Sequence, residues 1–122
     1  MQPKVSLKEK LDSFDELWVP KVIGELNDQY VKVAKFQGEY VWHFHENEDE
    51  LFLVIEGEMD LHFRDGTVNL KAGEMFIIPR GVEHKPEAKD ICQALLFEPA
   101  TTRNTGNVST DKTIEPDKLQ KI

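Results

Sequence analysis

The sequence predicts an all-β protein, either a sandwich or a barrel of short strands. From Val22 onward, apolar and polar residues alternate in short runs, which is typical of strands with one face in a core. Turn residues interrupt these runs at intervals of about 8–12 residues, a spacing that indicates a sandwich or a barrel. The chain has 122 residues, which is room for one domain with a modest core.

The first 20 residues are expected to form a short helix or arm. Ser6 and Glu9 have the spacing of a capping box, in which each side chain bonds the backbone of the other residue. One apolar stripe of this helix would contain Leu7, Leu11 and Phe14. Pro20 then interrupts regular structure. We therefore expect an arm over residues 1–20, a β-domain over 21–100 and a polar tail over 101–122, in loops or a loosely packed strand.

The expected strands are separated by turns that contain Gly, Asn, Asp or Pro. Asn27-Asp28 and Asp65-Gly66 have the character of hairpin turns. Residues 46–49 form a polar loop, and the other turns lie at Gly38-Glu39, Gly57, Gly73 and Pro79-Arg80-Gly81. The strands between these turns would cover residues 31–36, 40–45, 51–55, 59–63, 68–70, 75–78 and 91–97.

Charge and composition exclude several classes of partner. Lys plus Arg is 15 and Asp plus Glu is 23, so the formal charge is −8. A chain this acidic is not expected to bind nucleic acid by neutralising phosphates, and anionic membrane surfaces repel it. The longest apolar run, residues 51–55, is too short to span a bilayer. Cys92 is the one cysteine, so no intrachain disulfide can form and the cytoplasm is the expected compartment.

Three of the four histidines and one glutamate have the spacing of metal ligands. His43 and His45 are two residues apart in an expected strand, so their imidazoles point to the same face. Glu50 begins the next strand and returns beside them if the two strands form a hairpin. His84 adds a third imidazole from a distant segment. Three neutral imidazoles and one carboxylate suit a divalent transition metal, which would be Fe, Mn, Ni, Co or Zn.

These residues lie in two ordered motifs that resemble those of the cupins. The first motif is present as Gly38, His43, His45, Glu50 and Gly57, with the first gap one residue shorter than usual. The second, Gly-x5-Pro-x-Gly-x2-His, is present with every spacing intact as Gly73, Pro79, Gly81 and His84. Glu48 and Asp49 are rival carboxylates, and Glu50 is favoured by its six-residue spacing to Gly57 and its parity with Phe52 and Val54.

The resemblance implies a double-stranded β-helix, the jelly roll of the cupin barrel, over residues 21–100. It implies that His43, His45, Glu50 and His84 hold one metal ion in the barrel pocket. Families similar to this one include dioxygenases, sugar-phosphate isomerases, decarboxylases and lyases, and cupins are commonly homodimers.

If His43 and His45 point inward, alternation assigns the two faces of the neighbouring strands. The expected pocket wall consists of Val41, Phe52, Val54, Met59, Leu61 and Phe63. The opposite face would carry Tyr40, Trp42, Phe44, Leu51, Leu53 and Ile55. An apolar patch of this size normally marks an interface, so we expect this face to form a homodimer. The alternative cover is the chain's own N-terminal arm.

The expected function is that of a small metal-binding domain that acts on or binds a small molecule. The apolar wall favours a small, partly apolar ligand, and a dioxygenase-like metalloenzyme is the preferred interpretation. One alternative is a non-catalytic module that binds a metal and a small ligand. Another is a sugar isomerase-type enzyme, which is less favoured because no Arg or Lys is expected at an inward strand position to bind phosphate. The sequence identifies no catalytic base beyond the metal ligands.

Overall fold

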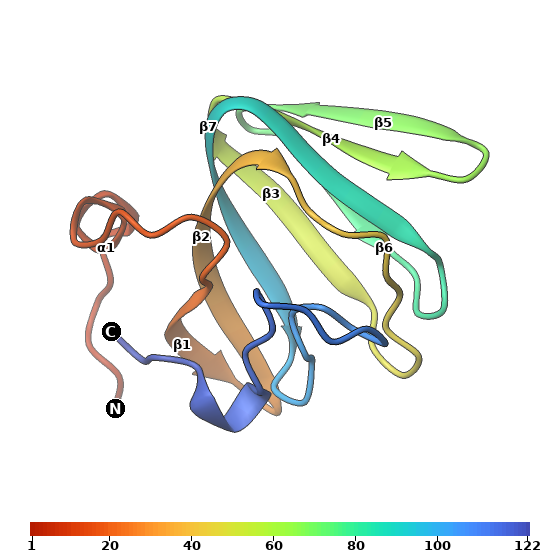
Figure 1. Ribbon diagram of the computed structural model, residues 1–122. Coiled ribbons are helices and arrows are strands. Elements are labelled where there is room, and N and C mark those ends of the chain that lie inside the picture. Colours follow the sequence, from red (N-terminus) through yellow and green to blue (C-terminus); the bar gives the residue numbers. More distant parts are fainter.

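The computed structural model describes residues 1–122, which form a mainly β-stranded chain with one short α-helix (Figure 1). The helices and strands, in chain order, are α1 (Leu7–Asp12), β1 (Lys21–Leu26), β2 (Gln29–Glu39), β3 (Glu50–Glu56), β4 (Glu58–Phe63), β5 (Gly66–Lys71), β6 (Met75–Ile78), β7 (His84–Pro99) and the 3-10 turn η1 (Pro116–Lys118). The predicted all-β class with a short N-terminal helix is therefore confirmed.

The strands pair in antiparallel fashion and wrap into a jelly-roll barrel. Five of them follow the order β1-β2-β7-β3-β6, while β4 pairs with β5 and β7. Strand β7 belongs to both layers, because its first residues pair with β4 and its last residues pair with β2 and β3. Figure 1 shows β7 running from the β4–β5 hairpin to the β2–β3 side of the barrel. This long strand links the two layers around one core.

The inner faces of β3 and β4 supply the centre of that core. Phe52 and Val54 of β3 and Met59 and Leu61 of β4 are each at most 3% exposed. They belong to one cluster that also contains the buried Cys92 of β7. The predicted inward parity of these positions is confirmed, since residues two apart on a strand face the same side.

The predicted strand over residues 40–45 is wrong, although the segment is extended. It forms one isolated bridge, in which His43 and His84 exchange two backbone hydrogen bonds of 3.0 and 2.9 Å. It also does not form a hairpin with β3, because both edges of β3 are already paired, one with β6 and the other with β7. Backbone partners come instead from several places, including Pro86 and Gly81.

The last strand is longer than the sequence predicts. β7 begins at His84, whereas alternation suggested a strand over residues 91–97. The added half contains Lys85, Pro86 and Glu87, which weaken the apolar pattern of a strand. This half pairs with β4, with Glu87 opposite Asp60. His84 is therefore the first residue of a strand.

The N-terminal arm packs on the outside of the barrel. Ser6 caps α1 as predicted, because its hydroxyl accepts a hydrogen bond from the Glu9 backbone at 3.3 Å. Leu11 and Phe14 then pack against Ile23 and Val33 in a second, smaller core. The arm thus covers part of the β1–β2 surface.

The C-terminal segment, residues 101–122, contains no strand but is firmly docked. Thr102 and Thr105 are fully buried. The Asn107 side-chain oxygen accepts from the Phe44 backbone N–H at 2.9 Å, and the Asn107 backbone N–H donates to the Phe44 carbonyl oxygen at 3.1 Å. The final backbone N–H, of Ile122, donates to Val22 of β1 at 3.0 Å. Figure 1 shows this segment crossing in front of the ends of the strands, with the two termini close together.

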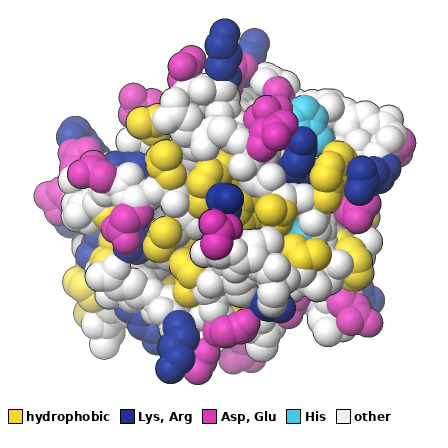
Figure 2. All heavy atoms as spheres, in the orientation of Figure 1, with side chains coloured by type: hydrophobic (Ala, Val, Ile, Leu, Met, Phe, Trp, Pro, Cys, Tyr) yellow, Lys and Arg dark blue, Asp and Glu magenta, His cyan; other side chains and the backbone are white.

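No helix in the structure has both the length and the apolar character needed to cross a bilayer. Figure 2 shows acidic and basic side chains interspersed over the visible face, with hydrophobic side chains between them. The formal charge of −8 is therefore not gathered into one acidic sector on this face.

Candidate metal centre

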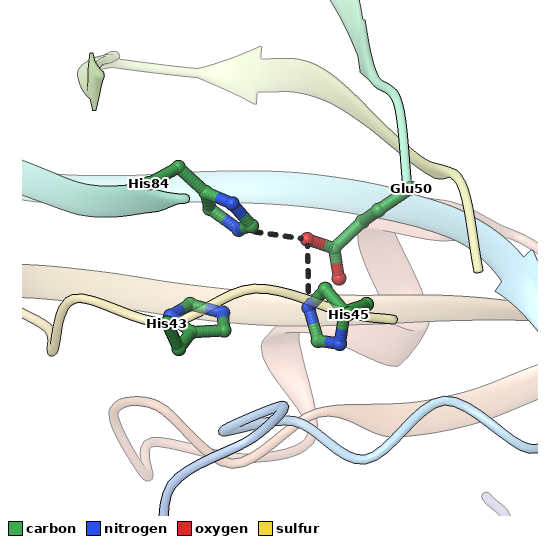
Figure 3. Close-up of side chains that lie close together, drawn as sticks. All are labelled: His43, His45, Glu50 and His84. Carbon is green, nitrogen blue, oxygen red and sulfur yellow. Dashed lines mark ion pairs between the residues drawn. The ribbon is translucent and has the colours of Figure 1, made fainter. Parts of the chain in front are cut away.

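The structure brings the four predicted ligands together inside the barrel. His43 and His45 come from the extended segment before β3, Glu50 is the first residue of β3, and His84 is the first residue of β7. All four residues are at most 4% exposed. Figure 3 shows their side chains converging on one point from opposite sides. The rival carboxylate Asp49 points elsewhere, accepting a hydrogen bond from the Arg80 backbone at 2.8 Å.

The separations between the four groups fit a single metal ion. One nitrogen or oxygen atom from each residue lies within 4.8 Å of the others. The Glu50 Oε1 atom is 3.5 Å from Nε2 of both His45 and His84 (Figure 3). Two atoms that each lie about 2.1 Å from one ion are roughly 3.0–3.4 Å apart at octahedral or tetrahedral angles. Little movement would therefore be needed to coordinate an ion.

Unpaired polar atoms support the same conclusion. Both ring nitrogens of His45, Nε2 of His84 and Oε1 of Glu50 are buried without a hydrogen-bond partner. Buried polar atoms in proteins are almost always paired, so a group of orphans in one place indicates a missing ligand. A divalent ion accepts the lone pairs of all four residues. The residues present therefore fit the metal that the motifs imply.

Backbone carbonyls orient two of the imidazoles. Nδ1 of His43 donates to the Val41 carbonyl oxygen at 2.9 Å, and Nδ1 of His84 donates to that of Val82, also at 2.9 Å. These bonds place the ring proton on Nδ1 and leave Nε2 free as a ligand atom. Burial, together with the nearby His84, lowers the pKa of His43 to about 4. His43 is thus neutral, and able to bind a metal, at physiological pH.

A second buried carboxyl group, Glu98 of β7, lies beside Glu50. Burial would raise the pKa of Glu50, but contact with Glu98, His45 and His84 outweighs burial and holds it well below its usual range. Burial and the nearby Glu50 raise the pKa of Glu98 well above its usual range, against the opposing effect of Lys32. Lys32 favours the charged form of Glu98 and Glu50 disfavours it, so the protonation of the two carboxyl groups is coupled.

A small cavity of about 30 Å³ opens beside the cluster. His43, Glu50 and Glu98 border it on the polar side. Its apolar walls are formed by Trp18, Phe36, Tyr40, Phe52, Leu96 and two prolines. A polar recess of about 210 Å³ lies at His45, between residues 46–48 and the C-terminal segment. The centre is therefore bordered by an aromatic pocket at His43 and Glu50 and by a polar recess at His45.

The structure places the pocket wall differently from the sequence prediction. Of the six predicted wall residues, Phe52 borders the cavity. Val54, Met59 and Leu61 lie deeper, in the packed core, because side chains fill the interior of so small a barrel. The other two are half-buried: Phe63 packs against Phe76 and against the His84 ring, and Val41 contributes its carbonyl group to His43.

The residues of the predicted outer face also lie in several different surroundings, and not on one common surface. Tyr40 points inward instead, where its ring stacks on Trp18 at 4.7 Å. Alternation fails here because β2 has a bulge between Phe36 and Gly38 and the segment that follows is not a regular strand. The Trp42 ring is covered by the Arg64 guanidinium at 3.7 Å.

Three residues of the predicted face remain on the outside of β3. Ile55 packs against the small core beneath the N-terminal arm. Leu51 and Leu53 are half-buried on the outer face of the sheet. Phe44, also half-buried, is bonded through its backbone to Asn107 of the C-terminal segment. Part of the predicted face is therefore covered by the chain's own arm and tail.

Sequence reasoning missed most of the residues that line the cavity, among them Trp18, Asn104 and Glu98. Trp18 comes from the N-terminal arm and Asn104 from the C-terminal segment, and nothing in their local sequence signals this position. Glu98 had a signal, because it shares strand parity with Leu96, which is buried. Lys32 corrects the expectation that no basic residue is inward, since it is fully buried on β2.

The fourth histidine lies outside this cluster. His62 of β4 is hydrogen-bonded through Nε2 to Glu87 at 2.7 Å and through Nδ1 to Thr67 at 2.9 Å. Asp60 lies within 4.8 Å of these groups, which together form a half-buried cluster. Both nitrogens of His62 are engaged, so this cluster offers no free imidazole atom.

Comparisons with known proteins agree with the motifs and the fold. The family model of the cupin domain matches residues 29–98. A crystal structure of a cupin-2 domain containing protein from Shewanella frigidimarina is 46% identical, with a TM-score of 0.77 over 78% of this chain and 93% of that chain. Protein NMB1881 from Neisseria meningitidis is 31% identical, with a TM-score of 0.74 over 80% of this chain and 99% of that chain.

Two curated relatives are matched over a part of their own length. An uncharacterized protein YdbB of Bacillus subtilis is 48% identical over 52% of this chain and 57% of its own. The 3-hydroxyanthranilate 3,4-dioxygenase of Xenopus laevis is 30% identical over 80% of this chain but 37% of its own. This chain thus spans little more than half of the first relative and about a third of the second. From the matched family model, the shared fold and the two intact motifs, the chain belongs to the cupin domain family.

Proposed function

We propose that His43, His45, Glu50 and His84 bind one divalent transition metal ion and that the loaded protein is a dioxygenase-like enzyme for a small, partly apolar molecule. The observation that carries the metal proposal is the convergence of four buried ligand atoms within 4.8 Å. The dioxygenase proposal draws support from the relative in Xenopus laevis, whose name is 3-hydroxyanthranilate 3,4-dioxygenase.

The chain's own groups prepare this site for a metal and a small ligand. The carbonyls of Val41 and Val82 hold the His43 and His84 rings in place. Glu50 supplies one negative charge, so a divalent ion would keep a net positive charge. Aromatic walls around the cavity favour a flat apolar body. An iron ion at this position would supply redox chemistry with dioxygen.

The acidic and aromatic lining favours this function over that of a sugar isomerase. A phosphate group would be held by Arg or Lys side chains in the cavity wall. The charged groups that border the cavity are the carboxyl groups of Glu50 and Glu98. Lys32 lies behind Glu98 and is already paired with it at 2.8 Å.

Metal analysis of the untagged protein tests the first half of the proposal. We expect about one transition metal ion per chain in the wild type, a large loss in His45→Ala, and full retention in His62→Ala. His62→Ala is the matched control, because it removes a histidine that is outside the cluster. Full retention of metal in His45→Ala would refute the ligand assignment.

Oxygen uptake tests the second half. The metal-loaded protein is supplied with a panel of small thiols, diketones and catechols, and dioxygen consumption is followed with an electrode. Consumption that depends on one compound class and disappears in His45→Ala supports the dioxygenase. A metal-loaded protein that consumes no dioxygen with any of them would instead be a non-catalytic binding module.

We also propose that the chain forms a homodimer through the outer face of β3 and β6. Strand register sets the half-buried Leu51 and Leu53 beside Ile77 and Met75, which are 50% and 52% exposed. A second copy would cover this apolar strip. Analytical ultracentrifugation should show twice the mass of one chain for the wild type and for the control Leu26→Lys, and the mass of one chain for Leu53→Lys. A single-chain mass for the wild type at micromolar concentration would refute the dimer.

The one cysteine is free and buried, so we keep the cytoplasm as the proposed compartment.

A further inference from the structure

A buried ion pair lies next to the metal centre without an evident structural purpose. Lys32 of β2 and Glu98 of β7 are joined by a contact of 2.8 Å between Nζ and Oε1, and their side chains are 0% and 2% exposed. Removing two charges from water is costly, and well-packed apolar residues at such positions are often as stable or more stable. A role in binding would explain why charged residues occupy these core positions.

The second oxygen of Glu98 receives no hydrogen bond from an N–H or O–H donor of the chain. Oε2 is buried, and Glu98 borders the cavity beside His43 and beside the carboxyl group of Glu50, with which it is coupled. The amide of Asn104, in the same wall, is bound to the C-terminal segment: its nitrogen donates to the Lys112 carbonyl oxygen and its oxygen accepts from the Ile114 backbone, both at 2.8 Å. Since buried oxygens are nearly always paired, Oε2 is a vacant bonding position for a molecule in the cavity.

The remaining walls restrict the shape of that molecule. The Trp18 ring stacks on Tyr40 at 4.7 Å and meets Phe36 at 4.6 Å, so the cavity is enclosed by aromatic faces. Its volume of about 30 Å³ holds roughly two water molecules while Trp18 is in place. A larger ligand must displace the Trp18 indole, which belongs to the N-terminal arm rather than to the barrel.

We propose that Glu98, held by Lys32, binds a hydroxyl group of a small planar molecule that enters the cavity beside the metal cluster. A hydroxyl group both donates and accepts hydrogen bonds, so it matches a carboxyl oxygen in such a site. The flat body of the molecule takes the place of the Trp18 indole against Phe36 and Tyr40, and its other end faces the four ligands. This inference rests on the proposed function, because the molecule lies between Glu98 and the bound ion.

Catechol binding to the zinc-loaded, full-length chain tests the inference. Zinc has no redox chemistry, so the probe binds without turnover. Lys32→Met/Glu98→Leu removes both charges together, and calorimetry measures the Kd for catechol. The matched control is Lys121→Met/Glu25→Leu, which removes an exposed pair, also at 2.8 Å, from the outer surface. Zinc content and thermal unfolding are measured for all three proteins.

We expect the buried double variant to keep its zinc, to unfold at a temperature no lower than the wild type, and to bind catechol roughly 10- to 100-fold more weakly. The control should bind catechol as the wild type does. Unchanged catechol affinity in the buried double variant, or no catechol binding to the zinc-loaded wild type, would overturn this inference but not the proposed metal site. A large fall in its unfolding temperature would also overturn the inference, because the pair would then be structural. A wild type that retains no zinc would overturn the proposed function as well.

Discussion

Gly106 offers a test of how the C-terminal segment supports the metal centre. Its φ angle is +55°, and a Cβ atom built there would lie 2.2 Å from the Phe44 carbonyl oxygen and 3.1 Å from Cδ2 of His43. The Phe44 backbone cannot yield easily, since two hydrogen bonds tie it to Asn107. In Gly106→Ala the methyl group must therefore move by about 1 Å or more to reach an ordinary contact, and it must take the C-terminal segment with it.

The expected cost follows from two effects. Overpacking of this kind costs about 1–3 kcal/mol, and the left-handed backbone adds about 1 kcal/mol for a residue with a side chain. The free energy of unfolding should therefore fall by about 2–4 kcal/mol, which lowers Tm by roughly 8–16 °C for a domain of this size. Because His43 is also crowded, metal affinity should fall by about 10-fold or more although no ligand is changed.

Thermal unfolding followed by circular dichroism measures the first effect, and competition with a chelator measures the second. Gly66→Ala is the matched control, since no atom lies within 4 Å of a Cβ built at that position. It should change Tm by no more than about 2 °C. If Gly106→Ala unfolds within 2 °C of Gly66→Ala, the docking of the C-terminal segment on the histidine segment is not as described.

Two further predictions concern titration. The pKa of His43 is lowered to about 4 by burial and by His84, so between pH 6.5 and 4 the unfolded chain binds a proton that the folded chain does not. The free energy of unfolding of the chelator-treated protein should be highest above pH 6.5 and should fall by up to about 3 kcal/mol as the pH drops to 4. Urea unfolding of His43→Gln should not show this loss. An equal loss of unfolding free energy in the wild type and in His43→Gln would contradict the assignment of this pH dependence to His43. Burial and the nearby Glu58 raise the pKa of Cys92 to about 12, so iodoacetamide at pH 8 should label the thiol slowly in the native protein and rapidly in urea. Rapid native labelling would show that the thiol is accessible.

The parts of the fold that depend on local chemistry were predictable from the sequence. The turn at Asn27-Asp28 joins β1 to β2, with Leu26 opposite Gln29, because turn residues act within a few positions of the chain. The inward parity of Phe52 and Val54 followed from the period of a strand. The four candidate ligand residues follow from two spaced motifs, since spacing within a motif is a local property as well.

The parts of the fold that depend on contacts between distant residues were not predictable from the sequence. The segment 40–45 has the composition of a strand, yet β3 is already paired on both edges, so the segment bridges His84 instead. The polar half of β7 is a strand because β4 pairs with it. The tail over 101–122 has little apolar character, yet Thr102 and Thr105 are buried, with hydroxyl groups that donate to the carbonyl oxygens of Pro99 in β7 and of Val108.

The sequence by itself determined the class of fold, the identity of the four candidate ligands and the inward face of the central strands, because each depends on residue type and spacing along a short stretch. Tertiary structure alone decided what surrounds those ligands. Trp18 arrives from the arm, Asn104 from the tail, and the free oxygen of Glu98 from a strand whose partner Lys32 lies 66 residues away. A cavity exists between side chains from distant parts of the chain, so its shape and charge are set only when the chain is folded.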